Sequence, residues 1–259
     1  MLELKTMPKG YDNLTVNRGL LLDLPFNEGI GSITKDIADP HHPVTFMGAA
    51  PGPTWEKVAI SNTNVLKFVH TVSDDYLVSL DIDTADLNFT GDYSLACWVY
   101  LENLVDDGIL IGRYRLDTDG WELYFSHADP SLNGYLTLRH HNSTFTYWPD
   151  YRTGCYSVGW FTGSWWFMGL SRSGPFPVMY RNGVALDMTY GWNTAHDFFG
   201  MRDPLGIAPN VQDLIIGARF THDASFFKGK MWRPRAWNRA LAAEEWQYIF
   251  ETERDLFGV

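Results

Sequence analysis

Leu214-Ile-Ile-Gly-Ala218, then Phe226-Phe-Lys-Gly-Lys-Met-Trp-Arg-Pro-Arg-Ala-Trp-Asn-Arg-Ala-Leu241, and then residues 242–250 carry the clearest structural pattern of the chain. The first segment is a short apolar run closed by Gly217, which predicts a buried strand. Large side chains alternate through the second segment, which predicts another strand. Because Pro234 lacks a backbone donor, this strand should lie at a sheet edge or carry a bulge. The last segment predicts a short helix with three apolar side chains on one face: Trp246, Ile249 and Phe250.

Upstream of this segment, short apolar runs recur at even spacing, with glycine and other turn residues between them. The predicted strands are residues 20–26, 65–69, 76–80, 93–101, 108–113, 120–125, 134–139, 144–148, 165–171 and 178–181. Asn182-Gly183 is the strongest hairpin signal, because both residues tolerate the positive φ of a type I′ turn. Residues 190–212 are expected to form a long loop. This pattern predicts an all-β antiparallel sandwich over residues 19–259, preceded by an N-terminal arm over residues 1–18.

The motifs of the chain resemble, in order and spacing, the laminin-G-like jelly-roll modules of the concanavalin A-like lectin and glucanase superfamily. The residues that carry the resemblance are Leu22-Asp-Leu-Pro-Phe26, Glu28-Gly29, Lys35-Asp36, Tyr93-Ser-Leu-Ala-Cys-Trp-Val99, Tyr180-Arg-Asn-Gly183, Ile216-Gly217, Phe227-Lys-Gly229, Asn238-Arg-Ala-Leu241 and Glu244-Glu245. The resemblance implies a two-sheet jelly roll with a short C-terminal helix, and free-standing modules of this kind resemble those of phage structural proteins. It implies a fold more firmly than an activity.

Composition excludes several classes of partner. The 259 residues carry a formal net charge of −11 and no run of Lys and Arg, so we expect no nucleic-acid partner. No stretch approaches the roughly 20 apolar residues of a transmembrane helix, so we expect no membrane insertion. The first ten residues lack the apolar core of a secretory signal, which leaves two explanations: a sequence trimmed from a longer one, or a protein that reaches the outside by assembly, as a virion component does. The two cysteines do not form a disulfide framework, and Cys97 is expected to be a buried, unpaired thiol, with pairing to Cys155 as the alternative.

The sequence does not predict an enzyme. Retaining glycosidases need two carboxylates about 5–5.5 Å apart, which on a strand means acidic residues at i and i+2 or i+4. Glu122 is the strand-like glutamate in the relevant region, but its neighbours at those positions are Tyr124 and Ser126. The chain also lacks the Gly-x-Ser-x-Gly turn of serine hydrolases.

Two pairs of aspartates are candidate calcium ligands, since calcium prefers oxygen ligands from loops. They are Asp36 and Asp39 in one loop and Asp117 and Asp119 in another. The alternative for both pairs is turn formation, which Asp before Gly or Pro commonly supports. Trp232-Arg233 also stands where the resembling modules carry an acidic pair, and this departure argues against calcium.

Sugar recognition would use aromatic faces with polar groups beside them. Three aromatic residues flank Pro149-Asp150, a fourth lies in the predicted loop 190–212, and three residues near Asp117 could complete a polar rim. These candidate ligand-binding residues are Tyr147, Trp148, Tyr151 and Trp192, with Arg113, Tyr114 and Arg115 as the rim. Packing within the protein is the alternative role for each of them.

These observations favour a non-catalytic structural and adhesion module. The first hypothesis is a phage virion protein that decorates a capsid or tail, binds other virion proteins or copies of itself, and contacts surface glycans. The alternative is a secreted or cell-surface carbohydrate-binding lectin domain, with or without bound calcium.

Overall fold

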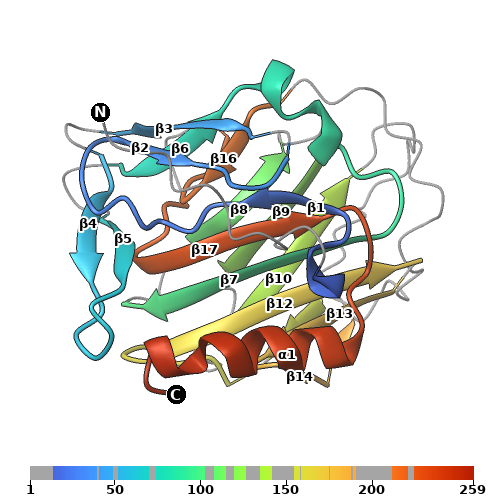
Figure 1. Ribbon diagram of the computed structural model, residues 1–259. Helices are drawn as coiled ribbons and strands as arrows, with labels where there is room; N and C mark the ends of the chain where they lie inside the picture. Colours follow the sequence, from blue (N-terminus) through green and yellow to red (C-terminus); the bar gives the residue numbers. More distant parts are fainter. Residues whose placement is uncertain are drawn as a thin grey trace.

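The computed structural model shows a two-sheet β-sandwich with a single α-helix in the described part of the chain (Figure 1). It describes residues 14–39, 41–48, 52–69, 74–102, 108–114, 120–126, 135–141, 155–157, 159–174, 176–187, 189–190, 212–220 and 225–259. The strand pairs are antiparallel throughout these residues, as in a jelly roll. The predicted fold class is confirmed.

The first sheet has eight strands, and β17 lies near its centre. Its order is β14 (Val184–Ala185), β13 (Phe176–Arg181), β12 (Trp165–Ser173), β7 (Tyr93–Leu101), β17 (Gly229–Trp237), β5 (Asn64–Phe68) and β4 (Thr54–Lys57), and β1 (Leu20–Asp23) also pairs with β17.

The second sheet has nine strands. Its order is β15 (Thr189–Tyr190), β11 (Cys155–Ser157), β10 (Tyr135–His141), β9 (Gly120–Ser126), β8 (Gly108–Tyr114), β16 (Leu214–Ile216), β6 (Tyr76–Ser79), β3 (Pro43–Met47) and β2 (Ile33–Lys35). Short 3-10 turns lie before the first strand, between strands or after the C-terminal helix: η2 (Thr15–Asn17), η3 (Asp81–Asp83), η4 (Ala85–Leu87) and η5 (Arg254–Leu256).

The two sheets pack face to face around one large hydrophobic core. Leu95 and Val99 of β7 enter it from the first sheet, and Leu123 and Phe125 of β9 enter it from the second. Each is at most 2% exposed, so each contributes on the order of 2 kcal/mol of burial. Cys97 lies in the same core as a free thiol, as expected, and burial raises its pKa.

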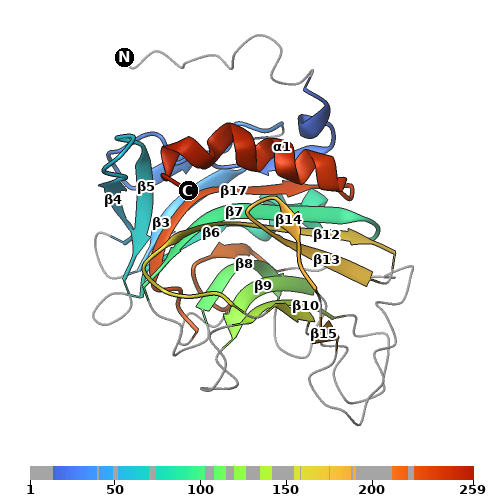
Figure 2. The ribbon, with the colours of Figure 1, turned by 90° about the horizontal axis from the view of Figure 1, so that it is seen from below.

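The helix α1 (Ala243–Glu253) lies on the outer face of the eight-stranded sheet (Figure 2). Its apolar face is the predicted one, because Trp246, Ile249 and Phe250 are all buried. The Trp246 indole donates a hydrogen bond of 2.9 Å to Ser171 Oγ of β12. Gly169 of β12 allows this close approach, since a Cβ there would lie 2.6 Å from the Trp246 ring. Of the helices in the described residues, none has the length and apolar character needed to cross a membrane.

Pro234 lies at a bulge in the middle of the sheet, which settles the choice that the sequence left open. The register of β17 against β7 shifts between Trp232 and Arg235, so that two residues oppose Cys97. Arg233 takes a φ of 54° there, a left-handed conformation that is unusual outside glycine. Proline has no N–H, and at a bulge the ladder requires no hydrogen bond from this position. β17 can therefore be a central strand despite Pro234.

The described residues at the start of the chain belong to the packed structure. Val16 is 8% exposed, and its carbonyl accepts a hydrogen bond of 2.8 Å from the Trp237 indole. Residues 14–18 of the predicted arm are therefore held against the end of β17. Residues 1–13 lie outside the described residues, and an arm there stays a prediction.

Candidate functional site

The strands that carry the predicted binding loops end together, at one end of the nine-stranded sheet. Tyr114 of β8 pairs with Gly120 of β9, and Gly120 pairs with His141 at the end of β10. The register also brings to this end the first residue of β11, the last of β15 and the start of β16, through the pairs Leu136↔Ser157, Cys155↔Tyr190 and Ile215↔Gly112. The strand residues that flank 115–119, 142–154 and 191–211 therefore lie toward the same end of the sheet. We refer to it below as the loop end.

The predicted loop residues themselves lie outside the described residues. They are Arg115, Asp117, Asp119, Tyr147, Trp148, Tyr151 and Trp192. The sequence alone did not show that these residues are connected through one sheet, because Trp192 comes 77 positions after Arg115. The strands that precede them, β15 and β8, belong to the same nine-stranded sheet. Their contact with a ligand stays a prediction.

Arg113 joins strand β8 to the neighbouring backbone at the loop end, and Tyr114 beside it is buried. Arg113 is fully buried: its Nε donates to the Gln212 carbonyl at 2.9 Å, and its guanidinium also contacts the Thr84 carbonyl and Asp81. Burial lowers the pKa of Arg113, and nearby aspartates offset part of that effect. Tyr114 is only 6% exposed. The expectation of an exposed polar rim is corrected for both residues, because both are buried, and Arg113 positions the backbone at Thr84 and Gln212.

The surface beside Arg113 is acidic with an apolar tip. Asp81 and Asp83 belong to η3, and the Asp81 amide donates to Asp213 Oδ1 at 2.7 Å. Ile82, between the two aspartates, is 83% exposed. The sequence places Asp81 and Asp83 at i and i+2, but it does not show that residues 81–83 and 213 lie together.

Asp36 has a structural role in its loop. Its carboxylate accepts hydrogen bonds from the backbone of Asp23 (2.8 Å), Ala38 (2.9 Å) and His42 (3.1 Å) and contacts the His42 ring Nδ1 at 2.7 Å. This is the turn-forming alternative. Asp39, its predicted partner in a calcium site, is exposed. Within the described residues, no three His, Cys, Asp or Glu side chains are grouped so as to hold a metal ion.

His42 lies between two carboxylates. Its Nδ1 is 2.7 Å from Asp36 and its Nε2 is 2.9 Å from Asp86 of η4, and the His42 side chain is fully buried. Burial by itself would lower the pKa of this histidine. The hydrogen bonds to Asp36 and Asp86 outweigh burial and raise the pKa to about 9. The imidazolium therefore joins the Asp36 loop to the turn that precedes β7.

Arg233 neutralises two buried carboxylates at the β17 bulge. Its Nε and one terminal nitrogen each lie 2.9 Å from an oxygen of Asp23, and the other terminal nitrogen lies 2.7 Å from Glu253. Arg235 adds contacts of 2.8 and 3.0 Å to Glu253. Two guanidinium groups thus face two carboxylates. The sequence showed the exchange of an acidic pair for Trp232-Arg233, but not which carboxylates Arg233 would meet.

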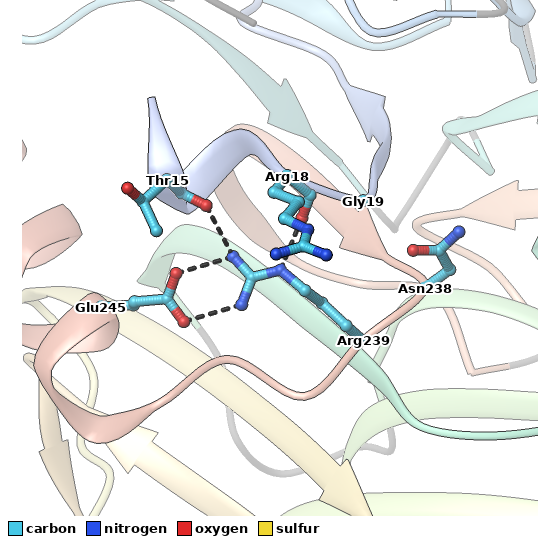
Figure 3. A pocket seen from close by; sticks show the side chains of 6 residues that line it. All are labelled: Thr15, Arg18, Gly19, Asn238, Arg239 and Glu245. Atoms are coloured by element: carbon cyan, nitrogen blue, oxygen red, sulfur yellow. Dashed lines mark hydrogen bonds and ion pairs between the residues drawn. The ribbon is translucent and has the colours of Figure 1, made fainter. Parts of the chain in front are cut away.

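A surface pocket of about 470 Å³ lies where the start of the chain meets α1 (Figure 3). Arg239 extends into it and pairs with Glu245 through contacts of 2.6 and 2.7 Å. The same guanidinium donates to the carbonyls of Thr15 and Arg18. The N–H groups of Arg239 are therefore used within the protein. They bind residues 15–18 to the rest of the sandwich.

Comparisons with known proteins support the fold. No family model matches the chain, and no curated protein matches it in sequence. The receptor-binding domain of a botulinum neurotoxin C/D mosaic serotype matches 92% of the chain with a TM-score of 0.59 at 12% identity. A botulinum neurotoxin type C structure, whose cell entry depends on two ganglioside molecules, matches 92% with a TM-score of 0.59 at 11% identity. The chain spans about half the length of these two, 52% in each case.

A third similar structure is a single domain of similar extent. It is domain 4 of AbnA, an extracellular arabinanase from Geobacillus stearothermophilus, in complex with arabinotriose. The match covers 89% of the chain and 97% of that domain, with a TM-score of 0.60 at 16% identity. At these identities the likeness is one of fold. The chain therefore has the jelly-roll sandwich that these binding domains share.

Proposed function

We propose that the protein is a non-catalytic glycan-binding module. The observation that carries this proposal is the loop end, where three connections leave neighbouring strands of one sheet and two of them, residues 142–154 and 191–211, hold the four predicted aromatic contacts. Loops gathered on a rigid scaffold are the usual place for recognition in β-sandwiches.

The similar structures support the same proposal. The arabinanase domain was seen with arabinotriose, and it corresponds to this chain over nearly its whole length. The type C neurotoxin is described with gangliosides. Arabinotriose is an oligosaccharide and a ganglioside carries one, so glycan recognition is the proposal that they favour for this chain.

In this proposal, Trp148, Trp192, Tyr147 and Tyr151 pack against apolar sugar faces, and Arg115 donates hydrogen bonds to sugar oxygens. Buried Arg113 acts as a positioning residue, since it fixes the backbone at Thr84 and Gln212. Each aromatic contact of this kind contributes about 1 kcal/mol.

A glycan array followed by calorimetry tests the proposal. We expect the protein to bind a defined set of oligosaccharides, and Trp148→Ala or Trp192→Ala to weaken that binding about fivefold. Tyr248→Ala is the control, because Tyr248 is a 51% exposed aromatic on α1, away from the loop end. Failure of the unmodified protein to bind any glycan would contradict the proposal.

The absence of catalysis is part of the proposal. Glu122 is 2% exposed, and Tyr124, rather than a second carboxylate, follows it on the same face of β9. We expect no release of reducing sugar from β-glucans or arabinans over long incubation. Hydrolysis that disappears in Glu122→Gln would reverse this view.

The narrower proposal is that the module belongs to a phage virion, where it decorates a capsid or tail and contacts virion proteins or copies of itself. It rests on the sequence resemblance to laminin-G-like modules, and an extracellular or cell-surface lectin is the alternative. Mass spectrometry of purified virions and of secreted fractions separates the two. Stoichiometric amounts on particles would support the virion protein, and recovery in secreted fractions alone would support the lectin.

A further inference from the structure

A row of five side chains crosses the outer face of the eight-stranded sheet, far from the loop end in the sheet topology. The register aligns one residue from each of five neighbouring strands: Thr54 of β4, Lys67 of β5, Lys230 of β17, Tyr100 of β7 and Trp165 of β12. We call this row the strip.

The strip lies on the face that carries α1. Trp98 of β7 stacks on Phe257 with ring centroids 4.3 Å apart, and Tyr100, two residues further along the strand, points to the same side. The Trp165 ring also lies 4.5 Å from Phe257, so the C-terminal residues border the strip. Both ribbon views place β4 and β5 beyond the C-terminal end of α1, so the helix does not extend over this part of the sheet (Figures 1 and 2).

Two aromatic rings of the strip are partly exposed, and their polar atoms are free. The rings of Tyr100 and Trp165 lie 5.6 Å apart. Neither the Tyr100 hydroxyl nor the Trp165 indole N–H forms a hydrogen bond in the part of the chain that the structure describes. By contrast, the indoles of Trp98 and Trp246 donate to Glu253 and Ser171. Tyr100 and Trp165 thus offer both an apolar face and a vacant hydrogen-bonding group.

The two lysines of the strip are paired with two neighbouring glutamates, Glu56 and Glu102, so that the local charges balance. Lys67 lies 3.1 Å from Glu56 and 3.8 Å from Glu102, and Lys230 lies 2.7 Å from Glu56 and 5.4 Å from the centre of the Tyr100 ring. These four side chains are 24–32% exposed. An ammonium has three donors and a carboxylate about four acceptor sites, so both kinds of group keep capacity for a further polar ligand.

These features select one class of ligand. An anionic ligand would gain little from ammonium groups that are already paired, and the net charge of −11 would repel it. An apolar ligand would leave the free donors unsatisfied. An uncharged sugar ring has apolar faces that pack against aromatic rings and hydroxyl groups at its edge that form hydrogen bonds. It therefore matches both kinds of group in the strip.

We propose that the strip binds an uncharged saccharide, with Tyr100 and Trp165 against the sugar ring and Glu56, Lys67 and Lys230 in hydrogen bonds with its hydroxyl groups. The inference rests on the proposed glycan-binding function and gives that function a second surface, made entirely of strand residues. An elongated saccharide matches it, because neighbouring strands are about 4.8 Å apart and the row spans five of them.

Nuclear magnetic resonance of the indole N–H groups gives the most direct test. Trp165→Phe identifies the Trp165 signal and keeps an aromatic ring against Phe257. Titration of the unmodified protein with neutral oligosaccharides, chosen from the array, should shift that signal in a saturable way. Sialylated or uronate oligosaccharides of the same length should leave it in place.

Calorimetry with matched variants completes the test. We expect Trp165→Ala to weaken binding of the neutral oligosaccharide about tenfold, the equivalent of about 1.4 kcal/mol. Tyr100→Phe removes only the free hydroxyl and should weaken binding a few-fold, so the test does not depend on the folding of the alanine variant. The matched control is Tyr248→Ala, which should bind like the unmodified protein.

The outcomes separate this inference from the proposed function. Saccharide binding that is lost in Trp148→Ala and Trp192→Ala, with Trp165→Ala and Tyr100→Phe unchanged and no shift of the Trp165 signal, would overturn the strip and leave the loop end as the site. Binding lost in the strip variants and kept in the loop variants would support the strip alone. No saccharide binding by the unmodified protein would overturn both.

Discussion

At the scale of single residues, His42 is the group whose titration should matter most for stability. Its folded pKa of about 9 lies above the usual value of 6.5, because Asp36 and Asp86 stabilise the imidazolium more than burial destabilises it. A raised pKa means that the folded state binds the proton more tightly than the unfolded state. The resulting stabilisation is complete below about pH 6.5 and is lost as the pH rises through about 9.

We therefore predict that the free energy of unfolding falls by on the order of 2 kcal/mol between pH 6.5 and 9.5, and that His42→Gln removes this decrease. Urea unfolding across that range measures the slope. His41→Gln is the matched control, since His41 is the neighbouring histidine and is exposed. An equal slope in the His42 and His41 variants would show that other groups cause the pH dependence.

Arg233 is the residue that balances the charge of two buried carboxylates, Asp23 and Glu253, at the β17 bulge. Without it, Asp23 would lose its guanidinium partner and Glu253 would keep only Arg235. We predict that Arg233→Ala lowers the free energy of unfolding by about 3–5 kcal/mol, because it leaves buried negative charge uncompensated. Chemical denaturation measures the loss.

The control for Arg233 is an exposed ion pair. Glu251 and Arg254 are 53% and 40% exposed and 3.5 Å apart, so Glu251→Ala should cost less than about 0.5 kcal/mol. Similar losses in Arg233→Ala and Glu251→Ala would mean that the buried network contributes no more than a surface pair.

At the scale of elements, the prediction from sequence succeeded for the periodic patterns in the described residues, whereas the predicted strand 144–148 lies outside them. The alternation from Met231 to Trp237 lies within β17, and the apolar face of residues 242–250 became α1. Asn182 and Gly183 have φ values of 51° and 77°, as the predicted type I′ turn requires. Strands such as β14 and β15 were missed, because two residues carry no period.

The contact between α1 and β12 depends on a glycine that no sequence pattern marks. A Cβ on Gly169 would lie 2.6–2.7 Å from two ring atoms of Trp246, within a packed layer. We predict that Gly169→Ala costs about 1–3 kcal/mol through displacement of the Trp246 ring, and lowers the thermal midpoint by several degrees. Loss of near-ultraviolet circular dichroism with intact strand signals would report that displacement.

Gly91→Ala is the matched control for Gly169. A Cβ added at Gly91 would meet no heavy atom within 4 Å, and Gly91 has no positive φ, so the same substitution should be nearly neutral there. Equal effects at the two glycines would point to a general intolerance of alanine rather than to the helix contact.

At the scale of the whole molecule, the candidate surfaces are products of strand pairing. The strip takes its side chains from residues 54, 67, 100, 165 and 230, which the sequence separates by up to 176 positions. The loop end likewise joins three distant connections. Composition and periodicity identify strands, but the order of strands in a sheet depends on the packing of the complete core. For that reason the fold was predictable and the strip was not.

Calcium dependence is also a property of the whole molecule, because a net charge of −11 attracts any cation. The carboxylates of Asp36, Asp23 and Glu253 already accept hydrogen bonds from protein donors. We therefore predict that a chelator leaves the thermal midpoint unchanged at physiological ionic strength. Calorimetric scans with EDTA, with calcium and with magnesium measure the thermal midpoint. Each scan is run in about 0.15 M salt, so that the screening of surface charges is the same in all three.

A rise in the midpoint with calcium, and not with magnesium, would contradict this prediction. It would assign the ion to oxygen ligands that Ca²⁺ prefers and Mg²⁺ does not, and Asp117 and Asp119 are the remaining predicted pair. Asp117→Asn combined with Asp119→Asn should then abolish the rise. If the rise survived that double variant, exposed Asp39 would be the next predicted ligand to replace, because its side chain, unlike that of Asp36, is open to solvent.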